Sequence, residues 1–302
     1  MSKTFIYTTF VYFITFGSIN PAVAEDDVFF QKKHTHDCGN QYYGQTTPQY
    51  LSQNNFDIYY LCFDGFAVGY TGVGKVALWS AEHLTKQRLE QAQTLERKDS
   101  FHEESQLPNR VKATLNDYKK MPYDRGHLAP NGDMATPEQQ YDSFSLANIV
   151  PQNPNHNRSL WRSLETRTRY LTLKYGDVYV VTGTAFWGKN IKKLNNKILV
   201  PTHLYKAIYI PSLNQAGVYF SPNNDSGLVE VISLDELAMR ISVDVMPSVD
   251  PSVQKIAMPL PTENLDDTPK SKPKNQDNHT FWVFLINLAL ALLEWLASVL
   301  KN

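Results

Sequence analysis

The sequence has almost no net charge and almost no cysteine, and each shortage limits what the protein can be. Its 29 lysine and arginine residues nearly balance 30 aspartate and glutamate residues, which leaves a formal net charge of -1. This excludes a protein that coats nucleic acid by bulk positive charge, so any anionic partner must meet a local basic patch. With only Cys38 and Cys62 present, at most one disulfide can form. A hydrophobic fraction of 42% and an aromatic fraction of 12% are enough to build a globular core.

The chain also lacks internal repeats, clusters of metal-binding side chains and motifs that read nucleic-acid sequence. No group of Asp, His or Cys occurs at ligand spacing, so a metal site closed by several side chains is not expected. A hard cation such as Mg²⁺ is still compatible with the sequence, because it keeps several waters and takes only one or two protein oxygens. Without a recognition helix, zinc finger or stacking-platform motif, contacts with nucleic acid should show weak sequence preference.

Residues 1–24 have the pattern of a secretory signal peptide. A basic residue precedes the apolar stretch Phe5–Phe16, and small residues follow before the first acids. An uncleaved membrane anchor is the alternative, although the stretch is short for a bilayer span. In both cases the body leaves the cytoplasm, so we expect a periplasmic or secreted protein. In that oxidising compartment Cys38 and Cys62 should form a disulfide, worth about 3 kcal/mol, and not remain as two buried thiols.

The C-terminal part is predicted to be a disordered linker, residues 251–280, followed by a hydrophobic helix, residues 281–302. Proline, charged and amide side chains dominate residues 261–280, which have almost nothing to bury. The apolar segment after them is long enough to cross a bilayer as a helix. A membrane anchor is the first interpretation, and a helix that packs on a partner or on a second copy in a homodimer is the second. A core helix of the main domain is the third.

Residues 25–250 are predicted to form one α+β domain. Apolar residues alternating with glycines indicate two strands around a glycine turn in Tyr59–Trp79. β-branched and aromatic residues indicate strands at Asp177–Thr182 and Lys197–Ile210, whereas Asn157–Tyr170 lacks Gly and Pro and indicates a helix. Because strands and helices do not alternate regularly, we expect a central antiparallel or mixed sheet flanked by helices.

Three polar blocks carry the strongest functional signal. They are residues 123–130 (Tyr-Asp-Arg-Gly-His-Leu-Ala-Pro), 145–152 (Ser-Leu-Ala-Asn-Ile-Val-Pro-Gln) and 157–165 (Asn-Arg-Ser-Leu-Trp-Arg-Ser-Leu-Glu). Asn148 lies 21 residues after His127. Asn157 follows nine residues later, and Glu165 eight residues after that. This order and spacing resemble the DNA/RNA non-specific endonucleases of the ββα-metal type, and the resemblance extends over about residues 61–245.

The resemblance implies an endonuclease that hydrolyses phosphodiester bonds of DNA and RNA, uses Mg²⁺ or Mn²⁺, and leaves 5′-phosphate ends. Such hydrolysis needs a nucleophilic water and a cation beside the negative charge that builds on the phosphate. His127 can activate the water as general base. A neutral imidazole accepts a proton near pH 7 at little cost, provided that an acceptor holds its other nitrogen and fixes the tautomer.

Asn157 is assigned as the only direct protein ligand of the cation. One amide oxygen is adequate for Mg²⁺, because water and substrate phosphate oxygens complete its coordination. On an α-helix Asn157, Trp161 and Glu165 fall at i, i+4 and i+8 and share one face, so Glu165 is expected to accept hydrogen bonds from metal-bound water. His156 borders the ligand, but we assign it no role from the sequence.

Arg125, Asn148 and Arg97 complete the predicted catalytic set. Arg125 lies two residues before His127, so on a strand both face one side and the guanidinium can bind a phosphate beside the base. By resemblance, Asn148 orients the substrate or the base, and Arg97 matches the upstream arginine of the family. Ten Lys or Arg against two acids between residues 155 and 206 indicate a basic patch for DNA and RNA.

Two other functions stay open at this point. One is a non-catalytic nucleic-acid receptor tethered to a membrane by residues 281–302. The other is an enzyme of the same fold that acts on a different phosphodiester. The complete set of base, ligand and arginines favours an enzyme over a receptor, because a binding protein needs no base beside a metal.

Overall fold

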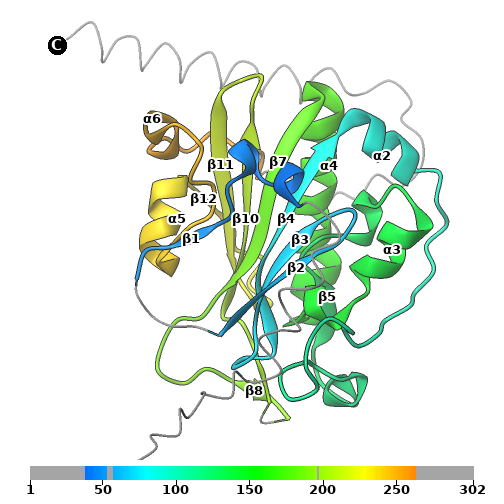
Figure 1. The fold of residues 1–302 in the computed structure, drawn as a ribbon. Coiled ribbons are helices and arrows are strands. Elements are labelled where there is room, and N and C mark those ends of the chain that lie inside the picture. Colours follow the sequence, from blue (N-terminus) through cyan, green and yellow to red (C-terminus); the bar gives the residue numbers. More distant parts are fainter. Residues whose placement is uncertain (1–37, 53–56, 196, 263–302) are drawn as a thin grey trace, which may run out of the picture. The chain divides into compact units, whose positions relative to one another are not determined.

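The computed structural model describes residues 38–52, 57–195 and 197–262 (Figure 1). These residues all belong to one unit of the chain, which begins at His36. The predicted signal peptide, residues 1–24, and the predicted hydrophobic helix, residues 281–302, lie outside the described residues. Within the described ranges, no helix combines the length and the apolar character needed to cross a bilayer.

A seven-stranded sheet forms the centre of this unit, with the strand order β12-β11-β10-β7-β4-β3-β2 (Figure 1). Every pairing between neighbours in this sheet is antiparallel. The strands are β2 (Ile58–Cys62), β3 (Ala67–Thr71), β4 (Val76–Thr85), β7 (Asp177–Ala185), β10 (His203–Ile210), β11 (Gln215–Pro222) and β12 (Glu230–Ile232). The α+β prediction is confirmed, and of the two sheet types expected the antiparallel one is found.

Helices cover both faces of the sheet. On one face α2 and α4 contact β4, and on the other α5 and α6 contact β11 (Figure 1). Trp79 and Ala81 of β4 pack in an apolar core with Leu237 of α5. Because side chains alternate along a strand, Glu82 of β4 points to the α4 face, where it is buried. The helices are α2 (Lys86–Ala92), α3 (Pro137–Ser143), α4 (Arg162–Tyr175), α5 (Leu234–Ile241) and α6 (Pro251–Gln254).

Short elements fill the loops around the sheet. Three two-stranded pairs are β1 (Gln49–Tyr50) with β13 (Val243–Asp244), β5 (Asp124–His127) with β6 (Ile149–Gln152), and β8 (Lys193–Leu194) with β9 (Ile198–Leu199). The 3-10 turns are η1 (Gly39–Gln41), η2 (Tyr43–Gln45), η3 (Leu115–Tyr118), η4 (Asn131–Asp133) and η5 (Leu146–Asn148). A π-helix, η6 (His156–Trp161), runs directly into α4. Of these elements, β5, β6 and η6 matter most for the site.

Two strand predictions need correction. Tyr59–Trp79 holds parts of three strands instead of two, because the chain reverses between β2 and β3 where the Phe63 amide donates to the Phe66 carbonyl at 2.9 Å. The expected strand Lys197–Ile210 is also divided. Its regular part begins only at His203, because Pro201 has no amide to donate to a neighbouring strand.

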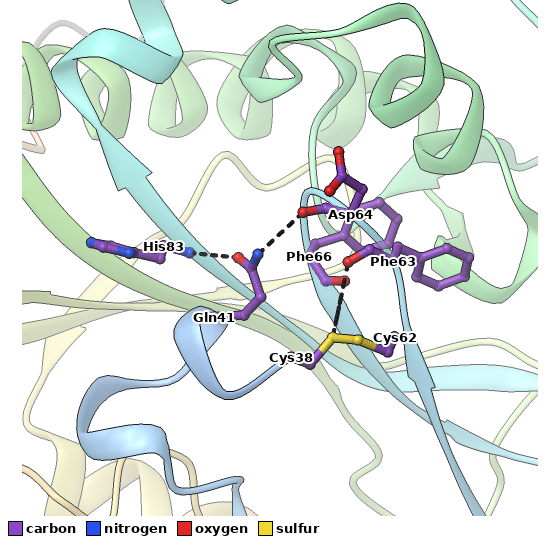
Figure 2. Close-up of a disulfide and its surroundings, with 7 residues drawn as sticks. All are labelled: Cys38, Gln41, Cys62, Phe63, Asp64, Phe66 and His83. Carbon is purple, nitrogen blue, oxygen red and sulfur yellow. Dashed lines mark hydrogen bonds between the residues drawn. A yellow bond between two sulfur atoms is a disulfide. The ribbon is translucent and has the colours of Figure 1, made fainter. Parts of the chain in front are cut away.

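The predicted disulfide between Cys38 and Cys62 is present, with a Cα–Cα distance of 5.7 Å. It ties the first described residues to β2. Beside it, the Gln41 side chain accepts from the His83 amide at 3.1 Å and donates to the Asp64 carbonyl at 3.4 Å (Figure 2). The N-terminal segment is therefore held against the sheet by one covalent bond and by a glutamine that joins β4 to the turn between β2 and β3.

The folded unit continues past the domain boundary predicted at residue 250. After α6, the Met258 amide donates to the Ala216 carbonyl at 2.6 Å, and Met258 and Leu260 are buried. The Tyr219 hydroxyl donates to the Pro261 carbonyl at 3.0 Å. Residues 251–262 thus pack along β11, although their proline and polar content had suggested the start of a linker.

Candidate active site

The candidate active site is built on two short strands and the helix that follows them. β5 pairs antiparallel with β6, and Asp124 lies opposite Gln152 while His127 lies opposite Ile149. From the end of β6 the chain enters η6 after three residues, and η6 continues as α4. His127 therefore lies on a strand and Asn157 on the helical part of one ββα unit, as the sequence predicted for the two residues.

His127 lies among aromatic rings. Its ring centroid is 5.6 Å from that of Phe101 and 5.0 Å from that of Phe144. Nε2 of His127 is buried and, among the described residues, has no hydrogen-bond partner. The expected acceptor that would fix the tautomer is therefore not found in the described part of the chain. Because Nε2 is buried, Nδ1 is the nitrogen better placed to take a proton from water.

The surroundings of His127 favour its neutral form. Burial of the ring lowers its pKa most, the Arg97 and Arg125 guanidinium groups lower it further, and Asp99 partly opposes them, so that the pKa falls to about 3. A base with this pKa is unprotonated throughout the neutral pH range. It can therefore accept a proton without first losing one.

Two arginines flank this aromatic group. The guanidinium carbon of Arg125 lies 3.8 Å from the centre of the Phe101 ring, and that of Arg97 lies 5.3 Å from the centre of the Phe144 ring. The two phenylalanines meet edge to face at 4.9 Å. Both arginines are exposed, so their remaining N–H groups can reach a phosphate. The structure thus brings Arg97, about 30 residues upstream in the chain, to the side of His127.

Asn148 is fully buried, and its side chain is used entirely within the protein. Its amide nitrogen donates to the Ala129 and Ser143 carbonyls, both at 2.9 Å, and its oxygen accepts from the Ala129 amide at 2.9 Å. These bonds hold the segment that directly follows His127. Of the two roles expected for Asn148, the geometry supports orientation of the base and leaves no group to touch a substrate.

Asn157 is oriented by Asp124, a residue that the sequence pattern did not single out. The Asn157 amide nitrogen donates to the Asp124 carboxylate at 3.0 Å, which leaves the amide oxygen for another partner. Arg158 donates two further hydrogen bonds to the same carboxylate, at 2.7 and 2.6 Å. Burial raises the pKa of Asp124, but the bonds from Arg158 and Asn157 outweigh it and hold the pKa below its ordinary value. The signal was available, because Asp124 directly precedes Arg125 in the first block.

The predicted α-helical alignment of Asn157, Trp161 and Glu165 is not found. η6 is a π-helix, in which hydrogen bonds run from i to i+5, so the extra residue turns Asn157 away from the face of Trp161. Trp161 is fully buried, whereas Asn157 and Glu165 are partly exposed. Among the described residues, the Glu165 carboxylate has no hydrogen bond or ion pair, and the residue is only partly exposed.

The charges around Glu165 were not foreseen. Burial raises its pKa, while Arg169, Lys206 and Arg97 oppose the rise. Lys206 is itself fully buried and donates to the Thr182 hydroxyl at 2.7 Å. It lies with Glu82, Asp133, Arg88 and Arg169 in a buried cluster of both signs between the sheet and α4. Burial, with repulsion from Asp133, raises the pKa of Glu82 to about 8.

This cluster corrects the predicted basic patch. Lys206 is inside the protein, and Arg169 is paired with Asp133 at 2.9 Å. Lys197 is paired with Asp117 at 3.0 Å. Only part of the positive charge counted between residues 155 and 206 is thus free to meet an anion. The sequence signal for the buried cluster was Glu82, a charged residue in an otherwise apolar strand.

The oxygen atoms that remain available as metal ligands suit a hydrated hard cation. The described residues contain no group of three or more His, Cys, Asp or Glu side chains that can hold a metal. They do present one amide oxygen at Asn157, whose nitrogen is already engaged, and one carboxylate at Glu165 without a protein partner. A cation that keeps most of its water needs no more than this.

The fold and the ββα arrangement of base and ligand define the class as a ββα-metal nuclease. The chain belongs to the DNA/RNA non-specific endonuclease family, whose family model matches residues 44–246. It is therefore a nuclease that hydrolyses nucleic acids, and the family is generally dependent on a divalent metal.

Several characterised proteins are similar to the chain. Nuclease C1 of Cunninghamella echinulata var. echinulata is 36% identical over 175 residues, covering 53% of this chain and 69% of its own length. A nuclease of Nostoc sp. is 30% identical over 225 residues, covering 69% and 79%. Human mitochondrial endonuclease G is 32% identical over 197 residues, covering 61% and 63%.

The fold has a counterpart among solved structures. A chain in the crystal structure of an EndoG/EndoGI complex superposes with a TM-score of 0.60 at 24% identity, and the match covers 64% of this chain and 88% of that one. At this level of identity the likeness concerns the fold alone. Both the family and the fold predicted from the sequence are confirmed.

Proposed function

We propose that the protein is an exported, Mg²⁺- or Mn²⁺-dependent endonuclease that cleaves DNA and RNA with little sequence preference and leaves 5′-phosphate ends. The observation that carries this proposal is the position of Arg97. Its guanidinium lies 5.3 Å from the centre of the Phe144 ring, which packs edge to face on His127 at 5.0 Å. Its charge also acts on Glu165 of α4, the helix that continues from the η6 turn bearing Asn157. A single phosphate bound there would meet both halves of the site.

The residues of the chain divide the reaction among them. Nδ1 of His127 takes a proton from water as the water oxygen attacks phosphorus, and the bond from phosphorus to the 3′ oxygen breaks, which leaves the phosphate on the 5′ side. Arg125 and Arg97 hold the phosphate oxygens. The Asn157 oxygen would hold the cation, and Glu165 would accept hydrogen bonds from its waters. When bound, the cation stabilises negative charge on the phosphate and on the departing oxygen.

Two features support export. Residues 1–24 have the pattern of a signal peptide, and Cys38 is joined to Cys62, a bond that persists in oxidising compartments. We further propose that residues 281–302 anchor the enzyme to a membrane. Cell fractionation of the full chain and of a chain ending at residue 280 tests this: an enzyme that stays soluble in both forms contradicts the anchor.

The chemistry is tested by replacing the base. His127→Ala should abolish cleavage of plasmid DNA and of RNA in Mg²⁺, because the group that takes the proton from water is lost, while DNA binding persists through the arginines. Gel assays with Mg²⁺ and then with a chelator measure cleavage, and filter binding measures the affinity for DNA. Products of the unaltered enzyme should accept a 5′ label only after phosphatase treatment. Cleavage that survives in the variant would remove His127 from the mechanism.

The ligand is tested separately. Asn157→Ala should lower kcat and raise the Mg²⁺ concentration that gives half-maximal rate by about tenfold, because the only direct protein oxygen is lost. An unchanged Mg²⁺ response would mean that another group holds the cation. Absence of nuclease activity with every divalent cation would favour a non-catalytic nucleic-acid receptor tethered to a membrane. Faster turnover of small phosphodiesters than of nucleic acid would favour an enzyme of the same fold that acts on a different phosphodiester.

A further inference from the structure

A chain of hydrogen bonds runs through the residue that precedes Asn157, and the mechanism above does not use it. His156 is buried in η6, and both of its ring nitrogens are occupied. Nδ1 lies 2.8 Å from the side-chain nitrogen of Gln152, and Nε2 lies 3.0 Å from the Ser221 hydroxyl. The Ser221 hydroxyl donates to the Leu228 carbonyl at 2.7 Å.

These contacts fix the direction of every bond in the chain. Because the Ser221 proton is given to Leu228, Ser221 must accept from His156, and Nε2 therefore carries the imidazole proton. Nδ1 is then the acceptor, which matches the amide nitrogen of Gln152 that faces it. With these bonds the His156 ring is neutral, carries its proton on Nε2 and has both nitrogens paired, while the Gln152 side-chain oxygen is buried with no hydrogen-bond partner among the described residues.

The chain of bonds joins the two halves of the active site to the central sheet. Gln152 lies on β6, opposite Asp124 of β5, and Ser221 lies on β11. The fit against β5 is close, because a Cβ added at Gly126 would lie 2.0 Å from the Gln152 side-chain oxygen and 2.7 Å from its Cβ. Glycine in the first block thus leaves room for the glutamine that holds His156.

Side-chain contacts hold the π-helix at its start. The Asn153 side-chain oxygen accepts from the His156 amide at 3.1 Å, which caps this end of the helix, and the His156 ring makes the two contacts described above. A π turn is rarer and less favourable than an α turn, so it persists where side-chain contacts specify it. His156 is the residue whose ring joins this turn to β6 on one side and to β11 on the other, and the backbone that it fixes leads directly into Asn157.

We propose that His156 is a positioning residue of the metal site, whose bonds to Gln152 and Ser221 fix the π turn so that the Asn157 oxygen faces the cation. The inference rests on the proposed function, in which Asn157 holds that cation. It assigns a task to a histidine that neither touches the substrate nor binds metal itself.

The test measures metal binding without turnover. His156→Phe keeps the ring volume and removes both hydrogen bonds. Free Mn²⁺, followed by electron paramagnetic resonance in a titration of the full-length protein, should show a dissociation constant raised about tenfold. In cleavage assays kcat should fall while KM for DNA stays within twofold, because the phosphate-binding arginines are unchanged. His203→Phe is the matched control, since this partly buried histidine of β10 stacks on Phe220 and lies tilted against Trp187, outside the site.

Milder variants separate the two bonds and protect the test against misfolding. Ser221→Ala removes the acceptor on β11, and His156→Asn retains an oxygen that can accept from Gln152. Each should weaken Mn²⁺ binding by about threefold, between the control and His156→Phe. If His156→Phe does not fold, these two variants decide, and unchanged Mn²⁺ binding in both overturns the proposal.

The remaining outcomes are distinct. A His156→Phe protein that loses only thermal stability, with the Mn²⁺ affinity of the control, shows a purely structural histidine and overturns the inference while leaving the metal role of Asn157 intact. If Asn157→Ala itself leaves Mn²⁺ binding unchanged, the ligand assignment fails first and the positioning role falls with it.

Discussion

At the residue scale, the environment of His127 holds its pKa far below the ordinary value of an imidazole. Burial and two neighbouring guanidinium groups make its charged form unfavourable, so the proton that it accepts during catalysis must be passed on quickly. Arg97 and Arg125 therefore act twice: they can bind the phosphate, and they keep the base ready. The sequence indicated the phosphate role from spacing and resemblance. The effect on the base depends on the shared aromatic contacts of Phe101 and Phe144, which spacing does not reveal.

This protonation state is measurable. With a folded-state pKa of about 3, His127 should show no titration between pH 4.5 and pH 7.5 in the metal-free protein. The proton on the carbon between its ring nitrogens, followed by NMR and assigned with His127→Asn, should keep the chemical shift of a neutral imidazole over that range. Arg97→Met should move the pKa upward, because a charge that disfavours the imidazolium is removed. A midpoint near 6.5 in the unaltered protein would contradict the role of burial.

At the level of elements, the local sequence pattern predicted the helix after Asn157 and the strand at Asp177–Thr182. Buried side chains recur about every 3.6 residues along a helix and every two residues along a strand, so both elements can be recognised from neighbouring residues. The π turn was not predictable in this way. It depends on a bond from His156 to Ser221, 65 residues away, and no window of neighbouring residues contains both. The same is true of Arg97, which reaches His127 only through the fold.

The β5–β6 pair depends on Gly126 for its spacing. Gly126→Ala should displace Gln152, destabilise the fold by about 1 to 3 kcal/mol as overpacking does, and reduce kcat through the disturbed π turn. Urea unfolding and initial cleavage rates measure the two effects. Adding Gln152→Ala removes the clash with the side-chain oxygen but leaves the contact at Cβ, so stability should recover in part and kcat should not. Normal activity in Gly126→Ala alone would show that β5 and β6 can separate freely.

At the scale of the whole folded unit, the two faces of the antiparallel sheet differ in what they carry. The α5 face is an apolar core around Trp79 and Leu237, and the α4 face holds the site above a buried group of charges. The cross-link between Cys38 and Cys62 lies at the edge strand β2 and secures the N-terminal segment that crosses the sheet. The protein thus concentrates its stability and its chemistry in different layers.

Loss of this cross-link should affect stability more than activity. Replacing both cysteines with serine should lower the free energy of unfolding by about 3 kcal/mol, since the bond closes a loop of 24 residues in sequence separation. Chemical unfolding of the variant and of the unaltered protein, both with and without reductant, measures the change. The cleavage rate per folded molecule should stay the same. A large loss of kcat at low temperature, with the variant folded, would show that the site is not independent of β2.

The bond between the Asn157 amide and Asp124 also bears on how the enzyme can be made. Asn157, Arg158 and Ser159 together match the acceptor pattern for N-linked oligosaccharide, and the sugar would be attached to the very nitrogen that donates to Asp124. Passage through a secretory route that glycosylates would therefore block the site before folding is complete. Production in host cells without that pathway, or folding that shields the acceptor before the sugar is attached, keeps the site intact.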